Sequence, residues 1–214
     1  FRLKVEKSRS VTDVGLDYGY SASNYSASFR QHHHVSPMEF RHSIHEKSLT
    51  NPVFQDAEVS LEGFEEINSK ISVEALHDFP VIFERHKGNY GDLSVHWGAF
   101  QEKYKHFMTE KTLLLERTYD DPSITDTDEC LYDLCMTIPE GSTPPSTCVI
   151  TGGRFAIYHF EGPVAQIYTA YQSIFNVWLP QSRCEIDERY GFEIYRKIDC
   201  DSMCMKIDLC IPIK

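Results

Sequence analysis

The chain has 214 residues, 41% of them hydrophobic and 13% aromatic, which is enough to bury a core as one large or two small domains. Its formal net charge of −11 argues against general nucleic-acid binding, but the charge is unevenly distributed. Residues 1–50 carry seven Lys and Arg against five Asp and Glu, whereas residues 51–214 carry fourteen against twenty-seven. A small basic segment followed by an acidic body indicates two modules with different partners.

No apolar stretch approaches the roughly 20 residues that a membrane span needs, and no signal peptide begins the chain, so we expect no membrane partner. Because the chain begins at Phe1 rather than Met, we expect it to be part of a longer or processed protein. The seven cysteines all follow residue 129 and form no CxxC motif, which is typical of reduced thiols in a cytoplasmic protein. Cys200-x-x-x-Cys204 leaves a redox or metal-binding role as the weaker alternative.

The first 47 residues predict three short helices from their capping signals. Residues 10–13, SVTD, have capping-box-like spacing, and Gly19 suits the left-handed position that ends such a helix. Ser21 is placed to cap a second helix over residues 22–33. Residues 36–39, SPME, predict a third helix, with Ser as N-cap, Pro in the first turn and Glu closing the box. Two helices across a Gly-containing turn indicate a helix-turn-helix.

Five of the ten histidines lie between residues 29 and 45, three of them consecutive at His32–His34. Consecutive helical residues point about 100° apart, so these three do not converge on one ion. His42 and His45 share a face, but no Cys or carboxylate completes that pair at ligand spacing. The sequence therefore predicts no metal site and no metal cofactor.

The stretch "VTDVGLDYGYSASNYSASFRQHHHVSPMEFR" resembles the second helix-turn-helix of AraC/XylS-type transcription regulators. The resemblance rests on Val14-Gly15, Gly19-Tyr20, Phe29-Arg30, Val35-Ser36-Pro37 and Phe40-Arg41, which match the family pattern in order. It implies a recognition helix that contacts promoter DNA in the major groove. The residues that it assigns to DNA contact are Ser23, Asn24, Arg30, Gln31 and Arg41.

The segment departs from that family in ways that weaken the expected DNA binding. The family carries two such units and only one is present here, with residues 1–7 resembling the end of the helix that joins them. Ala27 stands where Arg is common, and His33 and His34 stand where an aromatic residue and a glycine are usual. We expect weak DNA binding from this segment alone, and a plain helical packing unit is the alternative.

The acidic body contains an internal repeat after a linker at residues 48–69. Asp133-Leu134-Cys135 recurs as Asp208-Leu209-Cys210, and His86 recurs as His159. Each copy combines alternating strand patterns with an amphipathic helical stripe. We expect an α+β fold of two β-α-β-β units, with an antiparallel sheet on one face, two helices on the other and a cleft between the units.

Residues 70–214 resemble the GyrI-like effector-binding domains of Rob-type and multidrug-sensing regulators. The resemblance rests on "VEALHDFPVIFERHKGNYGDL", "VWLPQS", "YGFEIYR" and "KIDLCIPIK" in that order, together with the duplication. It implies that Glu193 lies at the floor of an aromatic cleft and pairs with cationic or polar ligands. Strand alternation alone places Glu193 on the face of Gly191 and Tyr195, opposite Phe192 and Ile194.

The other candidate ligand-binding residues are aromatic and belong to the helical stripes, a loop and the same strand: Tyr90, Trp97, Tyr171, Trp178 and Tyr195. Cation–π contacts with such rings would complement the carboxylate of Glu193. The structural alternatives are a solvent-facing strand glutamate and aromatic stripes that simply pack in the core.

We therefore predict a transcription regulator with three parts: a partial helix-turn-helix at 1–47, the linker, and an effector-binding domain at 70–214. Its expected partners are a small-molecule effector and promoter DNA, with RNA polymerase and gyrase as candidate protein partners and the oligomeric state left open. We predict no catalytic residues and no cofactor. Two alternatives remain: a GyrI-like hydrolase of strained electrophiles and a gyrase-inhibitor-like adaptor that binds protein.

Overall fold

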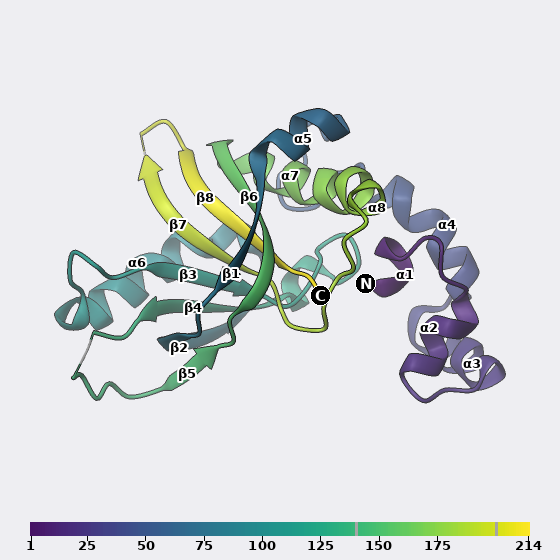
Figure 1. The fold of residues 1–214 in the computed structure, drawn as a ribbon, viewed down its shortest axis with the longest axis horizontal. Coiled ribbons are helices and arrows are strands. Elements are labelled where there is room, and N and C mark those ends of the chain that lie inside the picture. Colours follow the sequence, from purple (N-terminus) through teal and green to yellow (C-terminus); the bar gives the residue numbers. More distant parts are fainter. Residues whose placement is uncertain (140, 200) are drawn as a thin grey trace.

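A computed structural model describes residues 1–139, 141–199 and 201–214. It shows the expected α+β fold, with a group of short helices beside a curved antiparallel sheet (Figure 1). Among the described residues, no helix has the length and apolarity required to cross a membrane. Cys200 lies outside the described residues, and the six cysteines within them are free thiols.

The N-terminal helices form one unit, which we call the helical module (residues 1–47). Its helices are α1 (Arg2–Val5), α2 (Val11–Asp17), α3 (Ala22–His33) and α4 (Pro37–Lys47). The predicted caps are confirmed, since Ser10 Oγ and Ser21 Oγ accept bonds from backbone amides in the first turns of α2 and α3. Ser36 and Glu39 form a complete capping box on α4.

The module buries its own small core of Leu3, Val14, Phe40 and Ile44. Gly15 permits the close crossing of α2 and α3, because a Cβ added there would lie 2.7 Å from Tyr25 Cγ. Because Leu3 belongs to α1, this short helix is part of the module core.

The two unusual histidines of the module have separate structural explanations. His34 takes the left-handed conformation that glycine is expected to provide at the end of α3, with φ 59° and ψ 7°. The ring of His33 packs 4.3 Å from that of Phe29 and 6.0 Å from that of Phe40, centroid to centroid. His33 therefore occupies the aromatic position of the pattern as an aromatic side chain.

The expected linker is only partly irregular. It contains an isolated bridge between Thr50 and Glu58 and ends in α5 (Phe64–Lys70). Ile67 of α5 is fully buried in the core of the acidic body. The last third of the predicted linker thus packs as part of the domain that follows.

The sheet of the described residues has eight strands in the order β1-β6-β8-β7-β3-β4-β2-β5, all paired antiparallel. The strands are β1 (Ile71–Leu76), β2 (Phe79–Lys87), β3 (Leu114–Thr118), β4 (Leu131–Thr137), β5 (Thr147–Ile150), β6 (Gly153–Pro163), β7 (Phe192–Asp199) and β8 (Cys204–Pro212). The predicted repeat is confirmed, because β2, β3 and β4 form one half of the sheet and β6, β7 and β8 form the other. The two halves meet where β3 pairs with β7.

Each half also has a leading strand that the repeat analysis did not predict. β1 precedes the first copy along the chain but pairs with β6 of the second copy. β5 precedes the second copy but pairs with β2 of the first. Because the two copies exchange their first strands, neither half is a self-contained folding unit.

One face of the sheet is covered by helices, as predicted. α6 (Leu93–Tyr104) covers the first half through Trp97, Phe100 and Tyr104. The second half is covered by α7 (Ile167–Ser173), which continues through a π-helical segment (Ile174–Trp178) into α8 (Leu179–Ser182). The opposite face buries a separate cluster that includes Leu115, Phe192 and Ile194.

Candidate functional site

Two buried carboxyl groups lie side by side at the line where the two halves of the sheet meet. Glu116 of β3 is the register partner of Glu193 of β7. Glu116 is 1% exposed and Glu193 is 5% exposed. We call these two residues the seam pair. Residues that are direct partners in adjacent antiparallel strands project from the same face of the sheet, so their charges repel one another.

Each member of the seam pair accepts a hydrogen bond from a tyrosine. The hydroxyl of Tyr195 donates to Glu116 Oε2 at 2.6 Å, and the hydroxyl of Tyr171 donates to Glu193 Oε1 at 2.9 Å. Among the residues that the structure describes, no Lys, Arg or His side chain forms an ion pair with either carboxylate. The pair is therefore buried without a compensating positive charge.

This environment changes the acidity of both groups. Burial raises the pKa of Glu193 from 4.5 to about 7, although the hydrogen bond from Tyr171 opposes the shift. Burial also raises the pKa of Glu116 well above its usual range, and the charge of Glu193 raises it further. Both groups are therefore weaker acids than an exposed glutamate, and ionisation of one makes ionisation of the other less favourable.

Aromatic side chains enclose the seam pair. The ring of Trp97 packs edge-on against Tyr195 at 5.2 Å, and its buried Nε1 makes no hydrogen bond of normal geometry. Tyr90, in a 3₁₀ turn at Tyr90–Asp92, packs 5.4 Å from Tyr132 and donates its hydroxyl proton to the Asp120 carbonyl at 3.0 Å. Burial raises the pKa of Tyr90, and several nearby negative groups, the seam pair among them, raise it further.

Residues 69–214 match the family of GyrI-like small-molecule binding domains. The chain belongs to this family. The matched segment begins at the end of α5 and includes the whole sheet, the covering helices and the seam pair.

Two solved structures with low sequence identity share the fold of the GyrI-like domain, and a third is less similar. The crystal structure of the EcmrR C-terminal domain is 13% identical, covers 67% of this chain and 96% of that chain, and gives a TM-score of 0.56. The cryo-EM structure of the EcmrR–DNA complex in EcmrR-RPo is 12% identical, covers 94% of this chain and 81% of that chain, and gives a TM-score of 0.57. A hydrolase from Listeria innocua is 13% identical over 72% of this chain and 100% of that chain, with a TM-score of only 0.45. No match was found among curated proteins.

The structure gathers five of the six predicted ligand-binding residues around one point of the GyrI-like domain. These are Glu193, Tyr90, Trp97, Tyr171 and Tyr195. Trp178 is the exception, because its buried ring packs in the core of the second half and its Nε1 donates to Asn68 Oδ1 at 3.1 Å. Trp178 therefore takes the core role that a helical aromatic stripe usually has.

The seam pair is covered by the protein's own side chains, whereas the family resemblance implies that Glu193 lies at the floor of an aromatic cleft. The hydroxyls of Tyr171 and Tyr195 occupy the carboxyl oxygens, and both carboxyls are almost inaccessible to solvent. A ligand that contacts the carboxylates has to displace at least one of these aromatic groups.

Sequence reasoning missed Glu116, the partner of Glu193. The recognisable repeat signals of the first copy lie at residues 79–107 and 128–140, and β3 lies between them. The sequence does carry a signal there, because both β3 and β7 contain an apolar residue followed by glutamate, Leu115-Glu116 and Phe192-Glu193. A repeat extended over β3 predicts an acidic residue in both halves.

A second cluster of polar side chains lies on the opposite face of the sheet. Its three members are arranged in sequence like a nucleophile, a base and an acid that orients the base. Ser72 Oγ lies 3.0 Å from His159 Nε2, and His159 Nδ1 lies 2.7 Å from Asp208 Oδ1. However, the Ser72 hydroxyl donates to Glu74 Oε1 at 2.7 Å, so its proton is directed away from the imidazole. Asp208 also binds Arg196 at 2.7 Å. We assign no catalytic role to this group, since the nucleophile is not activated by the base.

Four of the five side chains predicted to contact DNA lie exposed on α3: Ser23, Asn24, Arg30 and Gln31. Arg41 differs, because its guanidinium is turned toward the backbone of the module. Its Nη1 donates to the Arg9 carbonyl at 2.7 Å and its Nε to the Leu3 carbonyl at 3.3 Å. Arg41 therefore holds α1 in place, and the structure does not present it with the other four.

Proposed function

We propose that this chain is the effector-binding part of a ligand-responsive transcription regulator, and that the seam pair binds a lipophilic cation. The observation that carries the proposal is a pair of buried carboxyls with tyrosine donors but no cationic partner. Proteins rarely bury carboxylates without pairing them, because desolvation of the charge is costly. A bound cation would supply the missing positive charge.

The surrounding rings suit an organic cation better than a metal ion. Trp97, Tyr90 and Tyr195 offer ring faces and edges near the carboxyls, and such rings attract a desolvated cation. Within the described residues, no group of three or more His, Cys, Asp or Glu side chains is arranged to hold a metal ion. The ligand class that fits is an amphipathic molecule with one delocalised positive charge.

The regulatory part of the proposal rests on the helical module. Its α3 presents polar and basic side chains to solvent, as a recognition helix does. The fold of 94% of this chain is shared with EcmrR in a structure of an EcmrR–DNA complex. Both points support promoter DNA as the partner of the module, and an AraC-type second helix-turn-helix remains our interpretation of residues 11–41.

The proposal is tested by titrating the protein with tetraphenylphosphonium in a calorimeter at pH 7.5. We expect binding to the wild-type protein and at least ten-fold weaker binding to Glu193→Gln, because the amide cannot neutralise the cation. Tetraphenylborate has the same shape and the opposite charge, so it should not bind. Glu84→Gln removes a partly buried carboxylate of β2 that binds Lys103 and Tyr104 of α6, away from the seam pair, and is the matched control. Equal affinity of the wild type and Glu193→Gln would refute the assignment.

Hydrolysis is the second candidate, and one observation favours it. A carboxyl whose pKa is raised to about 7 beside tyrosine hydroxyls also suits general acid–base catalysis near neutral pH. Incubation with a strained cyclopropane electrophile, followed by mass spectrometry, separates the two functions. Multiple turnovers that stop in Glu193→Gln would indicate an enzyme, whereas unchanged compound bound at one equivalent would indicate a sensor.

A further inference from the structure

The helix α1 lies between the helical module and the GyrI-like domain and belongs to both. Leu3 packs in the module core, and Val5 packs in the domain core beside Ile67. Lys4, between them in sequence, is 2% exposed. A single turn of helix therefore joins two hydrophobic cores.

Lys4 forms a buried ion pair with the loop that connects β3 to β4 (residues 119–130), which we call the β3–β4 loop. Its Nζ lies 2.5 Å from Asp121 Oδ2 and 2.9 Å from Ser123 Oγ. Asp121 also accepts bonds from the Ser123 amide and hydroxyl, so the turn is ordered around this carboxylate. Ile124 of the same loop packs against the module core.

The β3–β4 loop is also tied to the seam pair. It directly follows β3, the strand that carries Glu116. The hydroxyl of Tyr90, which packs in the same hydrophobic cluster as Trp97 and Tyr195, donates to the carbonyl of Asp120. Asp120 immediately precedes Asp121, so the contact to the site and the contact to the module lie on adjacent residues of the loop.

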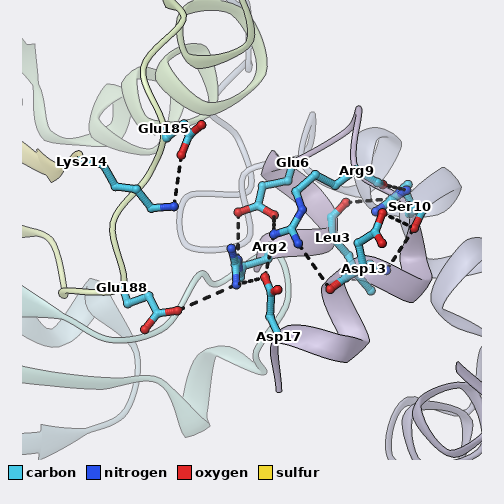
Figure 2. A network of polar contacts seen from close by, with 11 residues as sticks. Arg2, Leu3, Glu6, Arg9, Ser10, Asp13, Asp17, Glu185, Glu188 and Lys214 are labelled. Atoms are coloured by element: carbon cyan, nitrogen blue, oxygen red, sulfur yellow. Dashed lines mark hydrogen bonds and ion pairs between the residues drawn. The ribbon is translucent and has the colours of Figure 1, made fainter. Parts of the chain in front are cut away.

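The other charged contact at this boundary is longer and more exposed than the Lys4–Asp121 pair. Figure 2 shows Arg2 bound to Glu6 and Asp17 within the module, with Glu188 of the domain approaching it. The Arg2–Glu188 distance is 4.0 Å, and the side chain of Glu188 is 83% exposed. Exposed pairs of this kind contribute little. Lys4 and Asp121 thus form the dominant charged contact across the boundary among the described residues.

We propose that the β3–β4 loop couples ligand occupancy of the seam pair to the docking of the helical module, through Tyr90–Asp120 on one side and Asp121–Lys4 on the other. This inference rests on the proposed function. A cation that reaches the carboxylates has to displace Tyr171 or Tyr195, whose hydroxyls cover them. Tyr195 packs in the same hydrophobic cluster as Tyr90, so its displacement disturbs Tyr90, weakens the Tyr90–Asp120 bond and removes a constraint on the loop that holds Lys4. Ligand binding then loosens the docked module and changes how α3 is presented to DNA.

Coupling of this kind is reciprocal, which gives a test in two measurements. If the ligand loosens the Asp121–Lys4 contact, a substitution that breaks the contact should favour the ligand. We expect Asp121→Asn to bind tetraphenylphosphonium about five-fold more tightly than the wild type. In hydrogen exchange, the ligand should accelerate exchange in residues 2–5 and 119–125 of the wild type. In Asp121→Asn, exchange there should be fast without ligand and unchanged by it.

Glu188→Gln is the matched control, since it also removes one carboxylate at the same boundary. It should behave as the wild type in both measurements. If Asp121→Asn does not fold, Ser123→Ala removes one Lys4 contact without leaving a charge unpaired and should shift both measurements in the same direction.

The possible results distinguish failure of the coupling from failure of the proposed ligand-binding function. Ligand binding to the wild type with no change of exchange in residues 2–5, or equal affinity in Asp121→Asn, overturns the coupling and leaves the binding site intact. Failure of the wild type to bind tetraphenylphosphonium at all overturns the proposed function, and the coupling falls with it.

Discussion

Two of the places where the GyrI-like domain buries carboxylates, Asp133 and the seam pair, treat them in opposite ways. Asp133 of β4 is fully buried and binds Arg85 at 2.8 Å, Arg117 at 2.6 Å and the hydroxyl of Tyr119 at 2.5 Å. Burial alone would raise the pKa of Asp133, but the bonds from Arg85, Tyr119 and Arg117 outweigh it, and the pKa lies below its usual range. The seam pair has no arginine partner, and burial raises the pKa values of both of its carboxyls against the opposing bonds from Tyr195 and Tyr171.

The two places lie on opposite faces of one strand. In β3, Glu116 points to the helix-covered face, and its neighbour Arg117 points to the other face and binds Asp133. The backbone therefore does not explain the difference. Asp133 lies nearer the surface, beside the half-exposed Arg85, and two arginines neutralise it, whereas the seam pair is more deeply buried and has no cationic partner among the described residues. A carboxylate neutralised by two arginines stabilises the fold, whereas one left without a cation is free to bind one.

The largest expected effect comes from breaking the neutralised site. Asp133→Asn leaves Arg117, and the half-exposed Arg85, without their anion, and should lower the free energy of unfolding by about 3 kcal/mol at pH 7. Urea denaturation measures it. The repeat provides the control: Asp208→Asn affects partners that are half-exposed, Arg196 and His159, and should cost about 1 kcal/mol. Equal losses in the two variants would contradict the distinction.

The pH dependence of stability should have opposite signs at the two places. Asp133 has a lowered pKa, so its contribution is present above pH 3.8 and is lost as the pH falls through the folded-state pKa. Glu193 has a raised pKa, so its contribution is present below pH 4.5 and is lost as the pH rises toward about 7.

Glu193→Gln should therefore remove part of the decline in stability between pH 4.5 and 7. It should make the protein more stable than the wild type at pH 7.5, by on the order of 2 kcal/mol. Urea denaturation at several pH values provides the measurement, with Glu84→Gln as a control because Glu84 has a cationic partner in Lys103 and a lowered pKa. A wild-type curve that rises steadily over this range, or a variant less stable than the wild type at pH 7.5, would show that the seam carboxyls are not held as weak acids.

Much of the fold was predictable because local signals agree with it. The caps at Ser10, Ser21 and Ser36 define the module helices, and the recurrence of Asp133-Leu134-Cys135 at residues 208–210 reveals the duplication. The exchange of β1 and β5 was not predictable in this way. Which edge a strand joins depends on contacts between residues far apart in sequence, and no local pattern records it.

The site was predictable in part, for a related reason. Strand alternation and family resemblance indicate Glu193 and the face it shares with Tyr195. They do not show that Glu116 stands opposite, since that follows from the register of β3 on β7. Nor do they separate Trp97 from Trp178, because both occupy the apolar face of a covering helix and only tertiary packing places one beside the seam pair.

The smallest expected effect comes from comparing the tyrosine that binds Asp133, Tyr119, with the tyrosine that binds Glu116, Tyr195. Tyr119→Phe removes one bond to Asp133, but both arginines remain, so the free energy of unfolding should fall by about 1 kcal/mol or less. Tyr195→Phe removes the donor that holds down the pKa of Glu116, so the decline in stability should extend to higher pH than in the wild type. Because the loss of one hydroxyl is common to both variants, their difference isolates the effect of the missing arginines. Urea denaturation from pH 5 to 9 measures it, and parallel curves for the two variants would show that Tyr195 does not control the seam pair.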